Sequence, residues 1–225
     1  MSHDYCSLGL DESEKYSKGY KLKRLFDFCL ALMGLMIFSP LLVFIPFAIW
    51  LEDRGPIFYK QQRVGKGLKV FTVYKFRSMV KNAEEKTGPV WAKENDPRVT
   101  MVGRVLRATA MDELPQLFSI LKGDMSFVGP RTLRPFFVEK FAKEVPNYLS
   151  RFSVPPGLTG LAQIYAKYDS SAHQKLRFDL LYIKKRSFLL DLKLILISVW
   201  ITLRHRWESR NRKIKRIKIG RWRIT

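Results

Sequence analysis

Residues Phe28–Leu51, FCLALMGLMIFSPLLVFIPFAIWL, carry the strongest physical signal in the chain. The stretch contains no charged residue and is about long enough to cross the hydrocarbon core of a bilayer. It follows a polar segment and has no small-residue cleavage site, so we expect a retained anchor and not a signal peptide. Basic residues flank both ends. Because such flanks stay in the cytoplasm, both ends are expected on one side of the membrane.

A serine–proline pair, Ser39-Pro40, lies near the middle of this stretch. Proline removes a backbone hydrogen bond and clashes with the preceding turn, while the serine hydroxyl can satisfy a freed backbone group. A helix broken here could enter and leave through one face of the membrane, as a re-entrant helix. A spanning helix with a proline kink fits the same residues, so the physical argument leaves both topologies open.

A second apolar stretch, Ser187–Leu203, contains two charged residues. The favourable insertion energy of its aliphatic side chains is roughly cancelled by the cost of placing Asp191 and Lys193 in lipid. We therefore expect an amphipathic helix that lies at the membrane interface or packs on the protein core.

Charge narrows the kinds of partner. The 225 residues include 41 Lys and Arg against 20 Asp and Glu, which gives a formal net charge of +21 at pH 7. This balance favours nucleic acid, a phospholipid surface or a phosphorylated substrate. The basic tail, residues 204–225, interleaves Lys and Arg with Trp and Ile, which suits anionic lipid. The apolar stretch upstream favours lipid over nucleic acid for this tail.

Hydrophobic patterns predict the remaining elements. Alternation over Ile57–Val64 and Val70–Phe76, around the turn Gly65–Gly67, predicts a β-hairpin. Helical spacing runs from Val102 to Gly123, a natural residue to end a helix, and again over Ala172–Arg186. The two cysteines and three histidines are scattered, so we expect neither a disulfide framework nor a histidine metal site.

Two adjacent acids, Asp112 and Glu113, stand in the segment AMDELPQL, just before a leucine-spaced run. One carboxylate could cap a helix start, but capping does not require two. Adjacent carboxylates raise each other's pKa unless positive groups neutralise them. Four basic residues could do so: Lys75, Arg77, Arg107 and Arg131.

Together these residue types suit phosphoryl transfer. Arginine binds phosphate oxygens in pairs, and a Mg²⁺ ion held by a carboxylate can bridge a diphosphate. Neutralised charge lets an anionic nucleophile approach an anionic phosphate. The sequence therefore predicts a phosphoryl-transfer site around Asp112 and Glu113, with both carboxylates as candidate Mg²⁺ ligands.

Several motifs occur in order along the chain: YKFRSM, RATAMDELPQL, GDMSFVGPR, PGLTGLAQ and the spaced set Lys175, Asp179, Tyr182, Ser187 and Asp191. From about Lys21 to Leu203 the chain resembles the bacterial sugar transferases, the monotopic phosphoglycosyl transferases. The resemblance implies an enzyme on the cytosolic face of the bacterial inner (cytoplasmic) membrane. Such enzymes use Mg²⁺ and move a sugar 1-phosphate from a UDP-sugar to a polyprenyl phosphate, usually undecaprenyl phosphate, releasing UMP. This step begins the assembly of a surface glycan.

The resemblance also implies an architecture. We expect an α+β, mostly helical fold in which Ser39-Pro40 makes the membrane helix re-entrant. A small cytosolic catalytic domain with a β-hairpin and interfacial amphipathic helices follows. The expected parts are a polar tail (1–20), the re-entrant helix (21–53), the catalytic domain (54–203) and the basic tail (204–225). The short, stand-alone form of the family is expected.

Roles for the acids follow from the same resemblance. Asp112 corresponds to the nucleophile that forms a phosphoryl-aspartate intermediate, and Glu113 to the Mg²⁺ partner. Asp179 resembles a site aspartate, although an exposed carboxylate on a helix fits the same pattern.

Roles for the cations follow likewise. Arg107 and Arg131 match phosphate-contacting positions, and Lys75 and Arg77 belong to the family's KFR motif. The chain departs from the family after Arg131, where threonine replaces the usual proline. Arg134, just before the next proline, could therefore share or assume the phosphate role. Proline at position 155 also stands where a basic residue is usual, so one phosphate contact is missing or supplied elsewhere.

Two other function classes fit part of the sequence. A glycosyltransferase would release UDP and usually carries an Asp-x-Asp metal motif, which this sequence lacks. A non-catalytic basic protein that binds membrane or nucleic acid would explain the charge but not the paired acids. The sequence indicates neither the sugar nor the oligomeric state, and a homo-oligomer is compatible with it.

Overall fold

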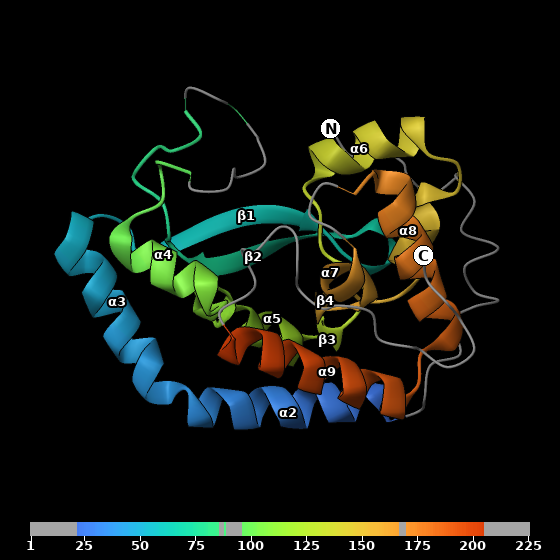
Figure 1. Ribbon diagram of the computed structural model, residues 1–225, viewed down its shortest axis with the longest axis horizontal. Coiled ribbons are helices and arrows are strands. Elements are labelled where there is room, and N and C mark those ends of the chain that lie inside the picture. The colour runs from blue at the N-terminus through green and yellow to red at the C-terminus, as the bar shows by residue number, and fades with distance from the viewer. Residues whose placement is uncertain (1–21, 86–87, 89–95, 167–169, 205–225) are drawn as a thin grey trace.

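The computed structural model describes residues 22–85, 88, 96–166 and 170–204 (Figure 1). Over these residues the protein is a mixed α/β fold, mostly helical, with two small two-stranded sheets. This confirms the coarse fold prediction. The predicted polar tail, and all of the basic tail except Arg204, lie outside the described residues.

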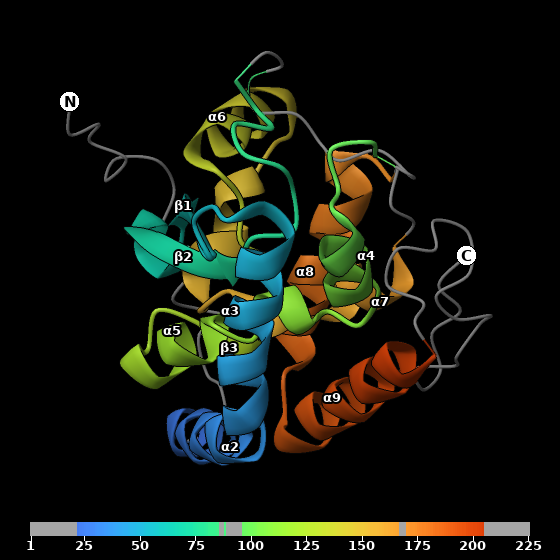
Figure 2. The ribbon, with the colours of Figure 1, turned by 90° about the vertical axis from the view of Figure 1, so that its left-hand side faces the viewer.

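The apolar stretch forms two helices, α2 (Lys23–Ile37) and α3 (Ser39–Asp53), that meet at a 60° bend. Pro40 sits in the first turn of α3, and the Ser39 hydroxyl donates to the carbonyl of Met36 at 2.8 Å. Among the described helices none alone has the length and apolar content to cross a bilayer, whereas α2 and α3 taken together do. Figure 2 shows α3 rising from the end of α2.

Both ends of this bent pair are attached to the rest of the protein. At the start of α2, Arg24 donates to the carbonyls of Ile120 and Leu121 in α5 (Gln116–Lys122). At the end of α3, Glu52 accepts from the first two amides of α4 (Met101–Ala108), at 2.6 and 3.1 Å. A carboxylate in this position satisfies amides that have no partner within the helix.

The predicted hairpin is present as β1 (Phe58–Val64) and β2 (Val70–Phe76), an antiparallel pair joined by the short 3-10 helix η2 (Lys66–Leu68). The register sets Tyr59 opposite Lys75. Directly opposed residues share one face of a sheet, so both side chains can reach the same cavity.

The single helical run expected over 102–123 is wrong, because the chain breaks into α4, the 3-10 helix η3 (Met111–Glu113) and α5. Thr109 turns its hydroxyl back to the carbonyl of Val105 at 2.8 Å, and Ala110 takes a left-handed φ of +56°. Hydrophobic spacing continues across this break, which is why periodicity did not reveal it. Gly123 ends α5 with a φ of +93°, as predicted.

Two short parallel strands, β3 (Ser126–Val128) and β4 (Gly157–Thr159), form the second sheet, and three glycines meet at their ends. A Cβ atom at Gly129 would lie 2.5 Å from the carbonyl oxygen of Pro155, and one at Gly160 would lie 2.2 Å from that of Gly129. A Cβ at Gly157 would lie 2.0 Å from the Gly129 nitrogen. The backbones therefore touch with no side chain between them.

Helical elements fill the rest of the fold. Those between the two short strands are α6 (Pro135–Glu144) and η4 (Tyr148–Ser153), and α7 (Leu161–Tyr165) follows β4. The helix predicted over 172–186 is confirmed as α8 (Ala172–Lys185).

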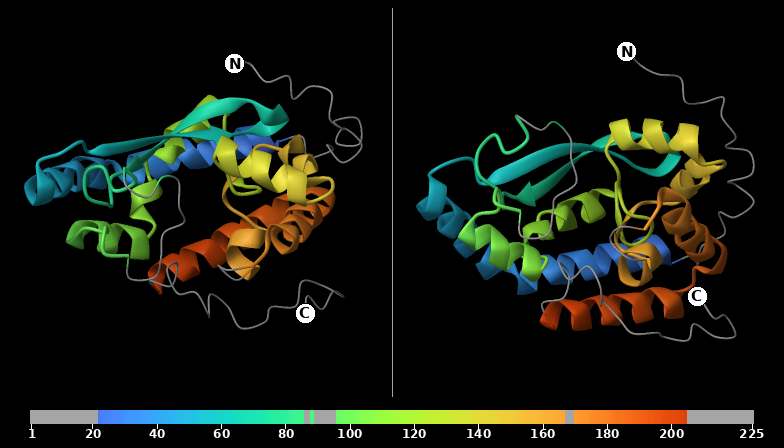
Figure 3. Two further views of the ribbon diagram at one scale, coloured as in Figure 1. Left: turned by 90° about the horizontal axis from the view of Figure 1, so that it is seen from above. Right: turned by 45° about the horizontal axis from the view of Figure 1, so that its top comes forward.

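The second apolar stretch forms α9 (Phe188–Leu203), which begins beside the start of α2 (Figures 1 and 3). Its Asp191 is fully buried and accepts from Lys23 of α2 at 2.6 Å and from the hydroxyl of Tyr182 at 2.9 Å. Leu194 is also buried, whereas Leu196 is exposed. The helix therefore packs on the core with one face and leaves an apolar face open.

Candidate active site

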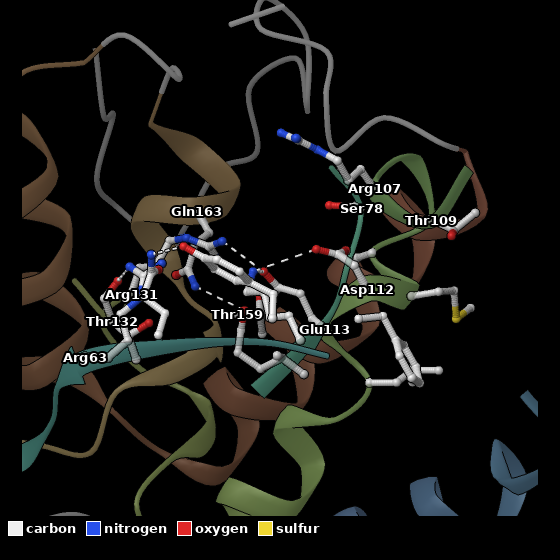
Figure 4. A pocket seen from close by; sticks show the side chains of 18 of the residues that line it. Arg63, Ser78, Arg107, Thr109, Asp112, Glu113, Arg131, Thr132, Thr159 and Gln163 are labelled. Carbon is white, nitrogen blue, oxygen red and sulfur yellow. Dashed lines mark hydrogen bonds and ion pairs between the residues drawn. The ribbon is translucent and has the colours of Figure 1, made fainter. Parts of the chain in front are cut away.

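A cavity of about 2130 Å³ lies between the hairpin, the α4–η3 segment, the loop after β3 and parts of α2 and α9 (Figure 4). All the residues predicted for the chemistry line it except Asp179. Apolar side chains of α2 and α9, among them Met33, Ile37 and Val199, line another part of the same cavity. It therefore joins a charged region to the apolar helices.

The two acids project into this cavity from η3, and Lys75 of β2 reaches both. Its ammonium contacts Oε1 of Glu113 directly and lies 3.9 Å from Oδ2 of Asp112. Arg131, from the loop after β3, places Nη2 3.0 Å from the same Oε1. Glu113 therefore receives two close cations on one oxygen, whereas Asp112 is paired only loosely.

This unequal pairing separates the pKa values of the two carboxyls. Burial raises the pKa of Asp112 to about 6, and the charge of Glu113 adds to the rise while Lys75 and Arg107 oppose it. Burial acts in the same direction on Glu113, but contact with Lys75 and Arg131 outweighs it and holds that pKa well below its usual range. Near pH 7 both groups are mostly ionised, and Asp112 is the more basic of the two.

Arg107 and Arg131 approach the acids from different elements. Arg107 stands in the last turn of α4, and its charge lowers the pKa of Asp112. Arg131 is about half exposed, with 47% of its side chain accessible, and so faces the open cavity. Cations on two sides of a carboxylate can hold a phosphate brought against it, so the phosphate contacts of both arginines stay a prediction that their positions allow.

The other predicted cations have their closest partners elsewhere. Arg77 is buried and pairs with Asp53 at the end of α3, at 3.2 Å. Arg134 pairs with Glu84 and donates to the hydroxyl of Tyr59 at 3.0 Å. Of the two arginines that could fill the phosphate role after β3, Arg131 is therefore the one in contact with the acids.

Asp179 is buried in α8 and is only 2% exposed, so its alternative interpretation as an exposed helix carboxylate is wrong. Its Oδ2 pairs with Nη2 of Arg151 at 2.8 Å. Burial raises the pKa of Asp179 to about 6, although Arg151 acts to lower it. The pair lies behind the loop that carries Arg131, since Arg151 also donates to the Arg131 carbonyl at 3.1 Å.

Among the cavity residues that sequence reasoning missed are Tyr59, Arg63 and Arg151. Tyr59 and Arg63 share one face of β1, because side chains four residues apart on a strand point the same way. That alternation, read together with the cross-strand position of Lys75, could have placed them. Arg151 lies in η4, and no motif or spacing marked it.

The site has the donor set that Mg²⁺ uses with a diphosphate. Among the described residues, no group of three or more His, Cys, Asp or Glu is placed to hold a metal ion, so substrate groups would have to supply further ligands. Mg²⁺ usually takes one or two carboxylates together with substrate phosphates, and Asp112 and Glu113 offer two adjacent carboxylates. Both cations on Glu113 fall on Oε1, so neither contact uses Oε2. The residues present therefore fit the ion.

A pair of unequal carboxylates set among lysine and arginine side chains is an arrangement suited to phosphoryl-transfer enzymes. The model of one family, the bacterial sugar transferases, matches residues 18–205. The chain belongs to this family.

Three relatives illustrate the similarity. The chain is 42% identical over 181 residues to the UDP-N-acetylgalactosamine-undecaprenyl-phosphate N-acetylgalactosaminephosphotransferase of Aeromonas hydrophila, covering 79% of this chain and 43% of that protein. It is 37% identical over 218 residues to the undecaprenyl-phosphate galactose phosphotransferase of Salmonella typhimurium, covering 91% and 45%. With the exopolysaccharide production protein PSS of Rhizobium leguminosarum it shares 38% over 187 residues, covering 79% and 93%. The chain thus spans less than half the length of the first two.

Proposed function

We propose that this protein transfers a sugar 1-phosphate from a UDP-sugar to undecaprenyl phosphate and releases UMP. The observation that carries the proposal is the acid pair, with Glu113 neutralised by Lys75 and Arg131 and Asp112 left basic and loosely paired. The named activities of the Aeromonas and Salmonella relatives support the same reaction class.

The proposed chemistry has two displacements at one phosphorus atom. An Asp112 oxygen attacks the phosphorus that bears the sugar, the bond from that phosphorus to the UMP oxygen breaks, and UMP leaves with the electron pair. A phosphate oxygen of the polyprenyl acceptor then attacks the same phosphorus and displaces Asp112, which returns to a free carboxylate. Asp112 suits this role because a basic, loosely paired carboxylate is a better nucleophile than the tightly paired Glu113.

The cations would bind and orient the phosphates in both steps. Arg107 and Arg131 lie on two sides of the acids, and Lys75 keeps the two carboxylates from repelling each other. A Mg²⁺ ion would be held by Glu113 and Asp112 and would supply further neutralisation of phosphate charge. Glu113→Gln is therefore expected to raise the Mg²⁺ concentration needed for half-maximal rate by about tenfold, since one ligand charge is lost. An unchanged Mg²⁺ requirement would assign the ion to other groups.

The membrane attachment we propose is re-entrant, with the catalytic residues on the cytosolic side of the bacterial cytoplasmic membrane. Arg24 attaches the start of α2 to α5, and Glu52 attaches the end of α3 to α4, so both ends of the bent pair belong to one body. The two ends of a spanning helix would lie on opposite faces. Exposed apolar side chains on α2, α3 and α9 offer a lipid-facing surface: Leu25, Met36, Ile37, Val43, Phe44, Phe47, Leu189, Leu196 and Leu203.

Topology can be tested by labelling. Single cysteines placed at residues 5 and 220, in a variant whose Cys6 and Cys29 are replaced, should both react from the cytosolic side of sealed vesicles. Labelling of the two positions from opposite faces would establish a spanning helix and reject the re-entrant arrangement.

The reaction can be tested by nucleotide release. Purified protein is incubated with Mg²⁺, undecaprenyl phosphate and, in turn, UDP-N-acetylgalactosamine, UDP-galactose, UDP-glucose and UDP-N-acetylglucosamine. UMP release with one of these donors supports the proposal and identifies the sugar. UDP release would indicate a glycosyltransferase, and neither nucleotide would leave a non-catalytic basic protein.

The covalent step has its own test. Protein trapped with donor alone should carry a sugar-phosphate adduct on the peptide that contains Asp112, detectable by mass spectrometry. An active preparation that never shows this adduct would favour direct transfer between the two substrates.

A further inference from the structure

Two arginine side chains that no sequence motif assigned hold the backbone of the loop after β3. Arg63 of β1 donates from Nη1 to the carbonyl of Thr132 at 3.1 Å. Arg151 of η4 donates from Nη2 to the carbonyl of Arg131, also at 3.1 Å. These carbonyls belong to two successive peptide units, and each is held by a separate guanidinium. The first of the two units is bonded directly to the Cα atom of Arg131.

The guanidinium of Arg151 is also held by contacts with side chains outside the loop. Arg151 is 4% exposed, donates from Nη1 to the Tyr148 hydroxyl at 2.7 Å and pairs with Asp179 at 2.8 Å. A guanidinium presents several donors in a fixed plane, so one side chain can bind a carbonyl, a phenol and a carboxylate together. Asp179 and Tyr148 therefore set the angle at which Arg151 meets the Arg131 carbonyl.

The positive charge of Arg63 lies in surroundings that disfavour a cation. Burial, together with the nearby charges of Arg131 and Arg134, lowers the pKa of Arg63 to about 10. A cation in such surroundings is retained at an energetic cost, and its contact with the Thr132 carbonyl gives it a structural use. The adjacent backbone bond from the Val64 amide to the Leu133 carbonyl, at 2.9 Å, extends the same attachment.

We propose that Arg63 and the Arg151–Asp179 pair are positioning residues that aim Arg131 at the acid pair and the bound phosphates. The Arg131 side chain is long and about half exposed, so its orientation depends on where its backbone is held. Placement within a fraction of an ångström matters for transfer to phosphorus. The proposal rests on the function proposed above, in which Arg131 contacts phosphate. It gives roles to Arg63 and Arg151, which the predicted site did not include, and to Asp179, for which the prediction left the role open.

A double-mutant test separates positioning from direct binding. Arg63→Met and Asp179→Asn should each lower kcat/KM for the UDP-sugar by about tenfold to a hundredfold in the otherwise unchanged protein. In an Arg131→Gln background the same two substitutions should lower kcat/KM by less than about twofold, because the side chain that they position is absent. Arg177→Met is the matched control: it removes an exposed arginine on α8, two residues from Asp179, and should leave kcat/KM unchanged.

Equal losses in both backgrounds would overturn the proposal and show that Arg63 or Asp179 acts independently of Arg131. Unchanged kcat/KM in the single variants would overturn it as well. If Arg63→Met does not fold, Arg63→Lys provides the same comparison, since lysine keeps the charge but not the planar fork. Failure of the unaltered protein to release UMP would instead refute the proposed function.

Hydrogen exchange gives a readout that needs no substrate. Amides of Arg131, Thr132 and Leu133 should exchange faster in Arg63→Met and Asp179→Asn than in the unaltered protein, while α8 peptides remain protected. Unchanged exchange in this loop would contradict positioning, whatever the activity of the variants.

Discussion

Two acid–cation clusters in this protein consist of the same residue types and differ in whether their carboxylates face the cavity. In the open cluster, Lys75, Asp112, Glu113 and Arg131 face a large cavity, and one carboxylate receives two close cations while its neighbour is loosely paired. In the closed cluster, Arg151 and Asp179 are both buried and pair at 2.8 Å, and although Arg151 touches the cavity wall, the carboxylate of Asp179 does not line it.

The comparison shows that a raised pKa does not by itself identify a reactive acid. Burial raises the pKa of Asp112 and of Asp179 alike, to about 6 in both. What separates the two is the space in front of the carboxylate, since Asp112 lines the cavity and Asp179 does not. We therefore expect substitutions in the open cluster to change activity, and removal of the cation in the closed cluster to change stability.

The largest expected effect is that of Asp112→Asn. Turnover should fall by a factor of about a thousand or more, because the amide is not a nucleophile. Stability should rise by about 1–3 kcal/mol at neutral pH, since folding no longer buries an ionised group with a raised pKa. This gain should be full above about pH 6 and vanish below about pH 4, where Asp112 is protonated in both states. UMP release and thermal unfolding measure the two effects.

Asp124→Asn is the control for this variant. It makes the same chemical change at a carboxylate outside the cavity lining, so both turnover and stability should stay near those of the unaltered protein. Near-normal turnover in Asp112→Asn would remove the distinction between the clusters.

The next effect is on stability, from Arg151→Met. Removing this cation leaves Asp179 buried without its partner, which should destabilise the protein by about 3–5 kcal/mol in chemical denaturation. Lys75→Met, in the open cluster, should cost clearly less, because Lys75 is 19% exposed and water can reach the acids that it leaves. Equal losses of stability would show that both clusters are structural.

A smaller and more diagnostic effect is expected on pH dependence. Log kcat/KM for the donor should fall with decreasing pH below about 6, because Asp112 must be ionised to attack. Glu113→Gln should move this limb to lower pH, since the charge of Glu113 raises the pKa of Asp112, and Lys75→Gln should move it to higher pH. If Asp179→Asn shifts the limb and these two variants do not, the closed cluster is the group that titrates.

The smallest expected effect is from Ala110→Gly, just ahead of η3. A left-handed φ is unfavourable for alanine and easily adopted by glycine, so stability should rise by about 1 kcal/mol. Activity should be unchanged if this turn only directs the acids into the cavity. A loss of activity would mean that the rigidity of this turn contributes to the chemistry.

Much of the open cluster could be predicted from sequence because its parts are local. Asp112 and Glu113 are adjacent, and the hairpin that carries Lys75 has a clear alternation. The closed cluster could not be predicted, since Arg151 and Asp179 stand on separate helices that only tertiary packing brings together. The break at Ala110 was hidden for another reason: alanine is the strongest helix former, yet here it takes a left-handed φ in a turn.

The membrane helix likewise has one feature that the sequence predicted and others that it did not. Ser39-Pro40 predicted a break, and the structure places a 60° bend there. The attachments of its two ends, through Arg24 and Glu52, involve partners far away in the sequence, so no local pattern could reveal them.

The three glycines at the ends of β3 and β4 bear on how this protein can be re-engineered. Each position excludes a side chain because of backbone that belongs to one of the others or to an adjacent residue. A library that varies Gly129, Gly157 or Gly160 in search of a new donor sugar would mostly return misfolded clones, even where the chosen side chains suit the sugar. Diversity is better introduced on the hairpin face around Tyr59 and Gln61, which lines the cavity without supporting the backbone contact.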